Sequence, residues 1–216
     1  MVLIFMIQNF IINNWSKFSV RIIVIFLTSC AIGSFFGSFL NIKNDYKSSL
    51  AFSNGYIHRN LYLDRNFDDE KKIMILSAAN RWNKATNHMV DFEVFNLPVD
   101  KNYLEEKNSI SIITISEDYP DIVFLDHITG FLTLAIYNEY MKVPMIALVE
   151  PRIEESFYEV IVLHELGHAL GLHHSYKNTV MSSSLLSMSK YITKEDLTQF
   201  CDLYSCDADM LNEETQ

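Results

Sequence analysis

The stretch HELGHALGLHH, residues 164–174, contains four of the seven histidines of the chain, together with one glutamate and two glycines. Residues four positions apart lie on the same face of a helix, so His164 and His168 can bind one metal ion together. Imidazole nitrogens are frequent zinc ligands, and in the pattern H-E-x-x-H the glutamate acts as general base toward the metal-bound water. We therefore expect His164 and His168 to be metal ligands and Glu165 to be the catalytic residue.

The residues after His168 indicate how a third ligand reaches the ion. Gly171 stands three positions further on, and glycine readily adopts the left-handed backbone conformation in which helices end. The chain can then turn back and bring His174 to the metal, which completes H-E-x-x-H-x-x-G-x-x-H and leaves one position open for water. His173 is expected to point away from the ion, at the surface or beside the ligands. A downstream glutamate such as Glu195 is the alternative third ligand.

Several elements must position this stretch, and the spacing of apolar residues places them along the chain. A long helix at 154–172 carries the first two histidines, an earlier helix opens at Asp68, and a last helix starts at Thr193 in a near capping box. Apolar runs predict strands at 56–64, 89–97, 109–116, 130–138 and 143–150, and DIVFL (121–125) fits a further strand. The alternation of strands and helices predicts a mixed α/β (α+β) fold.

The motif and the residues beyond it resemble the metzincin clan of zinc endopeptidases. That clan carries the elongated motif followed by a turn whose methionine lies beneath the metal (the Met-turn), and NTVMSS places Met181 seven residues after His174. Ser175 after the third histidine and the closing stretch TKEDLTQFCDLY are most similar to the matrixins. The resemblance extends over roughly Tyr56 to Cys206.

The resemblance implies a twisted, mostly parallel sheet with an antiparallel edge strand, an active-site helix and a C-terminal helix. It also implies one catalytic Zn²⁺, held by the three histidines of the motif. Gly171 and Met181 would be structural residues near that site.

Two further stretches resemble parts of the matrixin sheet. PDIVF (120–124) resembles its third strand. The segment that follows is too short for the family's structural zinc and calcium loops, so His127 is expected at the surface. GFLTLAIY resembles the edge strand that binds substrate, which here would include Phe131, Leu132, Thr133, Leu134 and Ala135.

The first forty residues differ in character from the rest. Ile22–Leu40 contains no charged residue, and its length is close to the about 20 apolar residues that a membrane-spanning helix needs. The run fits a retained anchor, a cleaved secretory signal or, through LTSC, a lipoprotein signal ending at Cys30. We expect a signal or anchor at 1–40, a linker at 41–54 and a catalytic domain at 55–210 that is secreted or membrane-anchored, outside the cytoplasm.

The net charge of the chain argues against one class of binding partner, and its cysteines bear on the redox state of its compartment. The formal net charge of −10 argues against nucleic-acid binding, because proteins that bind nucleic acid usually display a basic face. Cys201 and Cys206 are close enough in sequence to form a disulfide in an oxidising compartment, or else they are two free thiols. The oligomeric state is left open.

Together these patterns predict a zinc-dependent endopeptidase that acts on protein or peptide substrates, with Glu165 as general base. One alternative is a zinc peptidase whose third ligand is a downstream glutamate. The other is a membrane-attached binding or structural protein with a non-catalytic zinc site. The presence of Glu165 argues against this last alternative, because an inert site would be expected to lose the glutamate.

Overall fold

The computed structural model describes residues 52–53, 55–95, 108–129, 133–138 and 144–214. The chain divides into two compact units, Met1–Ser49 and Leu50–Gln216, and every described residue belongs to the second unit. The predicted N-terminal segment and most of the predicted linker lie outside the described residues. Within the described part, no helix combines the length and apolar character needed to span a membrane.

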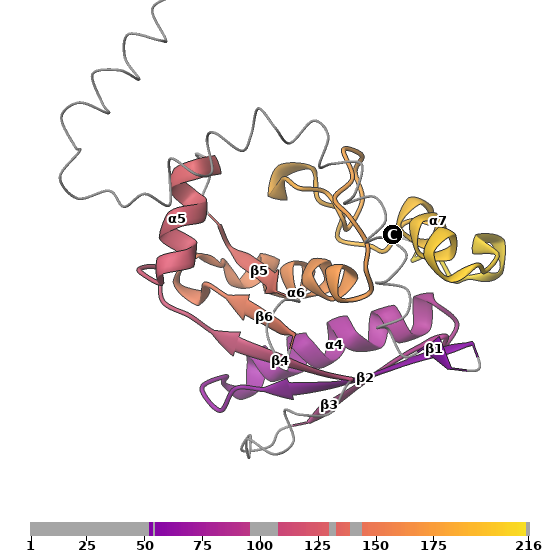
Figure 1. Cartoon of the computed structure of the whole chain (residues 1–216), viewed down its shortest axis with the longest axis horizontal. Coiled ribbons are helices and arrows are strands. Elements are labelled where there is room, and N and C mark those ends of the chain that lie inside the picture. Colours follow the sequence, from indigo (N-terminus) through magenta and orange to yellow (C-terminus); the bar gives the residue numbers. More distant parts are fainter. Residues whose placement is uncertain (1–51, 54, 96–107, 130–132, 139–143, 215–216) are drawn as a thin grey trace, which may run out of the picture. The chain divides into compact units, whose positions relative to one another are not determined.

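Six strands of the described part form one sheet (Figure 1). Strands β2, β3, β4 and β6 are parallel, with β3 and β4 on opposite edges of β2. Strand β5 runs antiparallel to β6 at one end of the sheet, and the short β1 runs antiparallel to β2. The strands are β1 Phe52–Ser53, β2 Tyr56–Leu63, β3 Val90–Phe95, β4 Ser109–Thr114, β5 Ala135–Asn138 and β6 Met145–Leu148. The predicted mostly parallel sheet with an antiparallel edge strand is confirmed.

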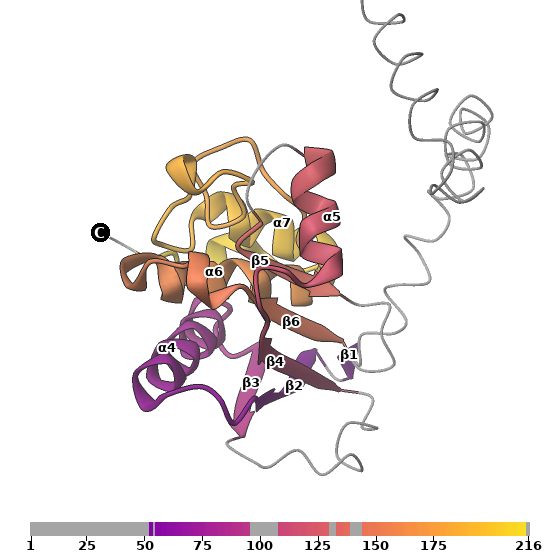
Figure 2. The same ribbon diagram turned by 90° about the vertical axis from the view of Figure 1, so that its left-hand side faces the viewer.

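The principal helices are α4 Asp69–Ala85, α5 Pro120–Thr129, α6 Glu155–Ala169 and α7 Lys194–Tyr204. Helix α4 begins as predicted, because the Asp68 side chain accepts the backbone N–H of Lys71 at 2.9 Å, which satisfies a donor without a partner in the helix. Helices α4 and α6 pack against each other on the same face of the sheet (Figure 2). Short 3₁₀ turns lie at Glu150–Arg152, Leu185–Ser187 and Ala208–Met210.

The core lies between the sheet and these two helices. The central strands contribute fully buried side chains such as Ile110 and Ile112 of β4. Trp82 of α4 is also fully buried, and its indole N–H donates to the carbonyl oxygen of Leu163 at 2.8 Å. Since Leu163 directly precedes the first histidine of the motif, this hydrogen bond attaches the histidine-bearing helix α6 to α4.

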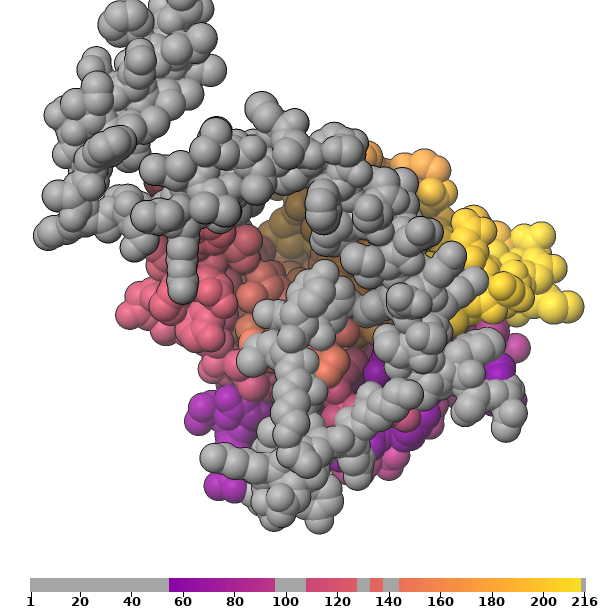
Figure 3. Space-filling view, viewed as in Figure 1, coloured from indigo at the N-terminus to yellow at the C-terminus, as the bar shows by residue number. Residues whose placement is uncertain are grey.

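The strand prediction for DIVFL (121–125) is wrong, as is the likeness of this stretch to the third matrixin strand, because these residues lie in helix α5. Pro120 occupies the first helical position, where its missing N–H has no partner to lose. Strand β4 already pairs directly with β6, so no further strand fits between them. Within DIVFL only Ile122 is fully buried, while Val123 and Phe124 are exposed, and α5 lies at the surface (Figure 3).

The edge strand is shorter than the predicted 130–138. Strand β5 covers Ala135–Asn138, and Phe131 and Leu132 lie outside the described residues. Pairing with the neighbouring strand nevertheless extends one residue before β5, because Val149 N–H donates to the carbonyl oxygen of Leu134 at 2.9 Å.

Candidate metal centre

Helix α6 ends as the glycine predicts. Gly171 has φ +85°, a left-handed conformation that a residue with a Cβ adopts only at a cost. Its N–H donates to the carbonyl oxygen of His168 at 2.8 Å, and Leu172 N–H donates to that of Gly167 at 3.0 Å. This pair of bonds is the Schellman arrangement. It closes the helix and reverses the chain, so that the following residues run back past the helix end.

The reversal brings the three predicted histidines together. His174 Nε2 lies 3.2 Å from His164 Nε2 and 3.1 Å from His168 Nε2. All three nitrogens lie within 4.8 Å of one another, and no other group of this kind occurs in the described part of the chain. Three imidazole nitrogens that converge in this way are a donor set suited to Zn²⁺.

Backbone carbonyls orient two of the imidazoles. His164 Nδ1 lies 2.7 Å from the carbonyl oxygen of Val180, and His168 Nδ1 lies 2.9 Å from that of Leu172. A neutral ring that donates from Nδ1 carries its lone pair on Nε2, and hydrogen bonds of this kind orient metal-binding histidines. The Nε2 atoms are therefore presented as acceptors, as a metal ligand requires.

The histidines are held in the neutral form. Burial, with a contribution from neighbouring histidines, lowers the pKa of His164 to about 3. Burial likewise lowers the pKa of His168 to about 4, and it lowers the pKa of His174. Since a metal ion competes with a proton for the ring nitrogen, low pKa values favour metal binding at neutral pH.

Glu165 is buried beside the first histidine. Its side chain is 5 % exposed, and its Oε2 has no hydrogen-bond partner. Burial raises the pKa of this carboxyl to about 8. Buried polar atoms in proteins nearly always have a partner, so a carboxylate oxygen left without one fits a site that a ligand completes.

Met181 packs directly against the active-site helix. It is fully buried, and its carbonyl oxygen accepts the N–H of Ser175 at 2.7 Å. A Cβ added at Gly167 would lie 2.3 Å from Met181 Sδ and 3.3 Å from Trp82 Cζ2. Gly167 therefore permits this close packing.

Sequence reasoning missed the part that Asp196 plays. Its carboxylate is 1 % exposed and accepts the backbone N–H groups of Val180 and Met181, each at 3.2 Å. It also accepts the N–H and the hydroxyl of Thr193, each at 2.8 Å. The T-x-x-D pattern predicted the helix cap, but no signal in the sequence links this aspartate to the Met-turn.

The remaining candidates lie outside the cluster. Glu195, the alternative ligand, is 45 % exposed and pairs with Lys177 Nζ at 2.8 Å. His173 is exposed, and its carbonyl oxygen accepts the side-chain amide of Gln199 at 3.2 Å. His127 is exposed in α5. Cys201, in the last turn of α7, and Cys206, just beyond the helix, form a disulfide, which settles an alternative that the sequence left open.

Comparison with known proteins places the chain in a family. The matrixin family model matches residues 58–205. High choriolytic enzyme 1, a hatching-enzyme zinc protease of the medaka fish Oryzias latipes, is 16% identical, with a TM-score of 0.45 over 72% of this chain and 92% of that one. Archaemetzincin of Methanopyrus kandleri is 13% identical, with a TM-score of 0.41 over 73% of this chain and 100% of that one. No curated protein matches the chain.

The matrixin match spans most of the chain and includes the three clustered histidines, Met181 and helix α7. The chain therefore belongs to the matrixin family and is a zinc metalloprotease.

Proposed function

We propose that this protein is an endopeptidase that hydrolyses peptide bonds in protein or peptide substrates, with zinc held by His164, His168 and His174. One observation carries the proposal: three Nε2 atoms converge within 4.8 Å of one another, and the residue after the first of them is a buried carboxylate with an oxygen that lacks a partner. A structural zinc site would have no use for such a carboxylate.

Zinc, when bound, activates a water molecule and polarises the scissile carbonyl. The protein's contribution is to accept and return a proton. Glu165 is proposed to take a proton from the attacking water at its carboxylate and to deliver it to the leaving amine. A buried carboxyl whose pKa is raised toward neutrality is suited to both steps, because it can exist in either protonation state near neutral pH.

The substrate is proposed to pair with the outer edge of β5. In an antiparallel pair, residues whose backbone groups face the partner strand alternate with residues whose groups face away. Leu134 accepts the N–H of Val149 at 2.9 Å, so the backbone groups of Ala135 face the opposite side. No strand of the described part pairs with β5 on that side, and an extended peptide can add to it.

The residue before Leu134 is already engaged. Thr133 N–H donates to Asp126 Oδ1 at 2.7 Å, and the Thr133 carbonyl oxygen accepts Nη1 of Arg152 at 3.0 Å. Asp126 and Arg152 are themselves paired at 2.7 Å. The stretch 131–135 was predicted to bind substrate. Within it, we propose that Ala135 makes the backbone hydrogen bonds to the substrate. We propose that this pairing stops at Thr133, whose backbone groups are already bonded to Asp126 and Arg152.

The test compares Glu165→Ala with Glu154→Ala, which removes an exposed glutamate at the start of the same helix. Glu165→Ala should keep its zinc and lose hydrolysis of an unfolded protein by at least about 100-fold, the usual contribution of a general base. Glu154→Ala should match the unmodified protein in both. Full activity in Glu165→Ala rejects the proposal, and zinc binding without turnover in the unmodified protein supports a non-catalytic zinc protein instead.

The third ligand has its own test. His174→Ala should bind zinc much more weakly than the unmodified protein, because one of the three converging nitrogens is lost. Glu195→Ala should bind zinc normally. If Glu195→Ala bound zinc weakly and His174→Ala bound it normally, Glu195 would be the third zinc ligand instead.

We further propose that the catalytic domain is secreted or anchored to a membrane through residues 1–40. Disulfides persist mainly in oxidising compartments outside the cytosol, and Cys201 and Cys206 form one. The uncharged run Ile22–Leu40 is consistent with this location. Fractionation of cells that express the full chain, with N-terminal sequencing of the product and lipid labelling at Cys30, tests it. An intact, unlipidated chain in the cytosol would contradict it.

A further inference from the structure

The segment after α7 folds back onto α4. Residues 206–214, here called the C-terminal strap, lie beyond the part of the chain that the matrixin model matches. Asn212 N–H donates to the carbonyl oxygen of Ala85 at 2.9 Å, and the Asn212 side-chain amide donates to that of Lys84 at 3.1 Å. The strap is thus attached to the last turn of α4.

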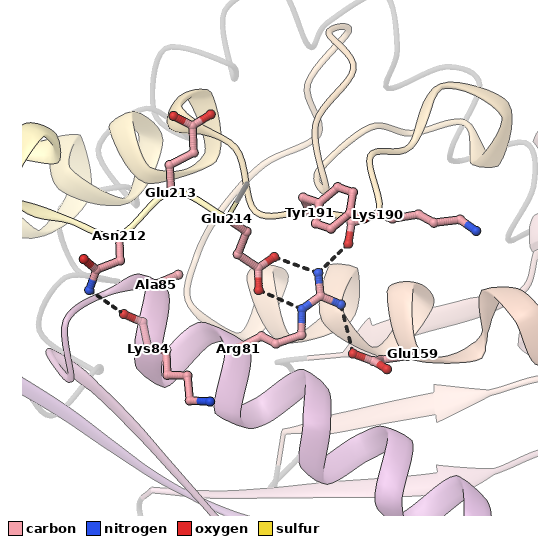
Figure 4. A pocket seen from close by; sticks show the side chains of 9 residues that line it. All are labelled: Arg81, Lys84, Ala85, Glu159, Lys190, Tyr191, Asn212, Glu213 and Glu214. Carbon is pink, nitrogen blue, oxygen red and sulfur yellow. Dashed lines mark hydrogen bonds and ion pairs between the residues drawn. The ribbon is translucent and has the colours of Figure 1, made fainter. Parts of the chain in front are cut away.

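Arg81 of α4 joins the strap to the active-site helix (Figure 4). Its Nε and Nη2 bind the two carboxylate oxygens of Glu214 at 2.8 and 2.7 Å, and its Nη1 binds Glu159 of α6 at 2.9 Å. Nη2 also donates to the carbonyl oxygen of Lys190. A guanidinium has five N–H groups in a planar fork, so it can hold several acceptors at once, which lysine cannot do in the same geometry.

Arg81 and Glu214 also hold the C-terminal end of the loop formed by residues 182–190. Arg81 binds the carbonyl of Lys190, the last residue of the loop. Glu214 accepts the N–H of Ile192 at 2.8 Å, and its own N–H donates to the carbonyl oxygen of Ile192 at 3.1 Å. The backbone is therefore held on both sides of Tyr191.

This loop is attached at two points to residues that adjoin the metal ligands. Ser182, its first residue, forms an isolated bridge with Ser175, which directly follows the third histidine. Ser189 N–H donates to the carbonyl oxygen of Thr179 at 2.9 Å, one residue before the carbonyl that orients His164. These two contacts attach the loop to residues that adjoin the metal ligands, so the loop is placed to meet a substrate side chain next to a scissile bond at the metal.

The interior of the loop depends on its own short-range contacts. Ser182 Oγ and Ser187 Oγ lie 2.6 Å apart, and Leu186 at the tip is fully exposed. The shape of the loop therefore depends on these internal contacts and on how its two ends are held.

We propose that Arg81 and Glu214 are positioning residues that set the shape of loop 182–190 and thereby select the substrate side chain accepted next to the scissile bond. The inference rests on the proposed function. A strap outside the family match thus controls the specificity of the site.

The expected effect is moderate. Arg81 and Glu214 line an open pocket of about 660 Å³ (Figure 4), so solvent reaches the ion pair. Ion pairs of this kind contribute up to about 1 kcal/mol, which corresponds to about a 5-fold change in a rate or binding ratio.

The experiment uses the full zinc-loaded chain and two peptides that differ only in the residue after the scissile bond, one small and one large. Glu214→Ala and Arg81→Lys should change the ratio of the two kcat/KM values by up to about 5-fold, at unchanged zinc content. Asp209→Asn is the matched control. It removes the 2.6 Å pair between Lys194 and Asp209 of the same strap, and it should leave the ratio unchanged.

A second measurement is independent of catalysis. In the metal-free protein, hydrogen exchange at the N–H groups of Ser189 and Ile192 should accelerate in Glu214→Ala and Arg81→Lys but not in Asp209→Asn. If the unmodified protein hydrolyses neither peptide, the proposed function fails, and the exchange rates alone decide whether Arg81 and Glu214 position the loop. An unchanged kcat/KM ratio in an active enzyme, or unchanged exchange at both N–H groups, overturns the inference.

Discussion

Two buried carboxylates near the metal centre differ in how many hydrogen-bond donors the surrounding structure offers them. Asp196 on α7 accepts the backbone N–H groups of Val180 and Met181 together with the N–H and hydroxyl of Thr193. Glu165 on α6 is buried almost as completely, yet one of its oxygens has no partner. The first carboxylate holds the Met-turn in place, and the second is the proposed proton carrier.

The difference shows how stability and reactivity are divided in this site. A buried carboxylate with several donors contributes to folding, whereas one without partners destabilises the fold and shifts its own pKa. Proteins tolerate such groups mainly where function requires them. Here the surrounding packing supplies the compensation, because the helix that carries Glu165 is attached to α4 through Trp82 and Leu163.

The largest expected contrast comes from neutralising each carboxylate in metal-free protein. Asp196→Asn should lower the free energy of unfolding by about 3 kcal/mol, because an amide nitrogen would face donors that now meet an oxygen. Glu165→Gln should be neutral or stabilising, since no donor loses its acceptor. Urea unfolding after chelation measures both.

The control for this contrast is Asp202→Asn, which changes an exposed carboxylate on α7 and should alter stability by less than about 0.5 kcal/mol. Equal losses in Asp196→Asn and Glu165→Gln would mean that the two carboxylates do not differ in their structural contribution.

The pH dependence of stability should separate the same two groups. Burial raises the Glu165 pKa from 4.5 to about 8, so between these values the folded state binds more protons than the unfolded state. The contribution of Glu165 to stability is therefore full at low pH and is lost as pH rises through this window, with a slope of about 1.4 kcal/mol per pH unit. Glu165→Gln lacks this loss, so its stability relative to the unmodified protein should rise across the window.

The contribution of the three histidines to stability has the opposite pH dependence. Their lowered pKa values mean that stability is lost as pH falls below about 6.5. The histidine contribution is the same in the unmodified protein and in Glu165→Gln, so it cancels in the difference between their free energies of unfolding. Chelated samples unfolded at several pH values from about 5 to 8 give the comparison, and a difference that stays constant would show that Glu165 titrates normally.

The convergence of the three histidines could be predicted from the sequence because its geometry is local. The spacing of His164, His168 and Gly171 determines the helical face and the reversal that brings His174 back. Helix α5 was not predicted, since a short apolar run after Asp118 fits a strand or a helix equally, and burial of Ile122 alone could not be foreseen.

Contacts between distant segments were also beyond sequence reasoning. The cap formed by Thr193 and Asp196 is a local pattern, but its contact with Val180 and Met181 depends on how α7 packs against the Met-turn. No periodicity encodes such a contact.

Gly167→Ala tests the other support of the Met-turn. The added Cβ would lie 2.3 Å from Met181 Sδ, and overpacking of a core typically costs 1–3 kcal/mol, or about 2 kcal/mol here. The better helix propensity of alanine returns about 1 kcal/mol, so a net loss of about 1 kcal/mol is expected. Met181→Ala in the same chain should remove this penalty, and a double-mutant cycle of unfolding free energies measures the coupling.

Thr193→Ala is the smallest change and the sharpest test of what Asp196 does. It removes one of the donors to Asp196 and the N-cap of α7, which should lower the free energy of unfolding by less than about 1 kcal/mol. Zinc content and hydrolysis should stay unchanged, because Val180 and Met181 keep their bonds to the carboxylate. If Thr193→Ala instead destabilised the protein as much as Asp196→Asn, the aspartate would serve chiefly as a helix cap. Its bonds to the Met-turn would then contribute little, and the contrast with Glu165 would be one of capping rather than of support for the metal centre.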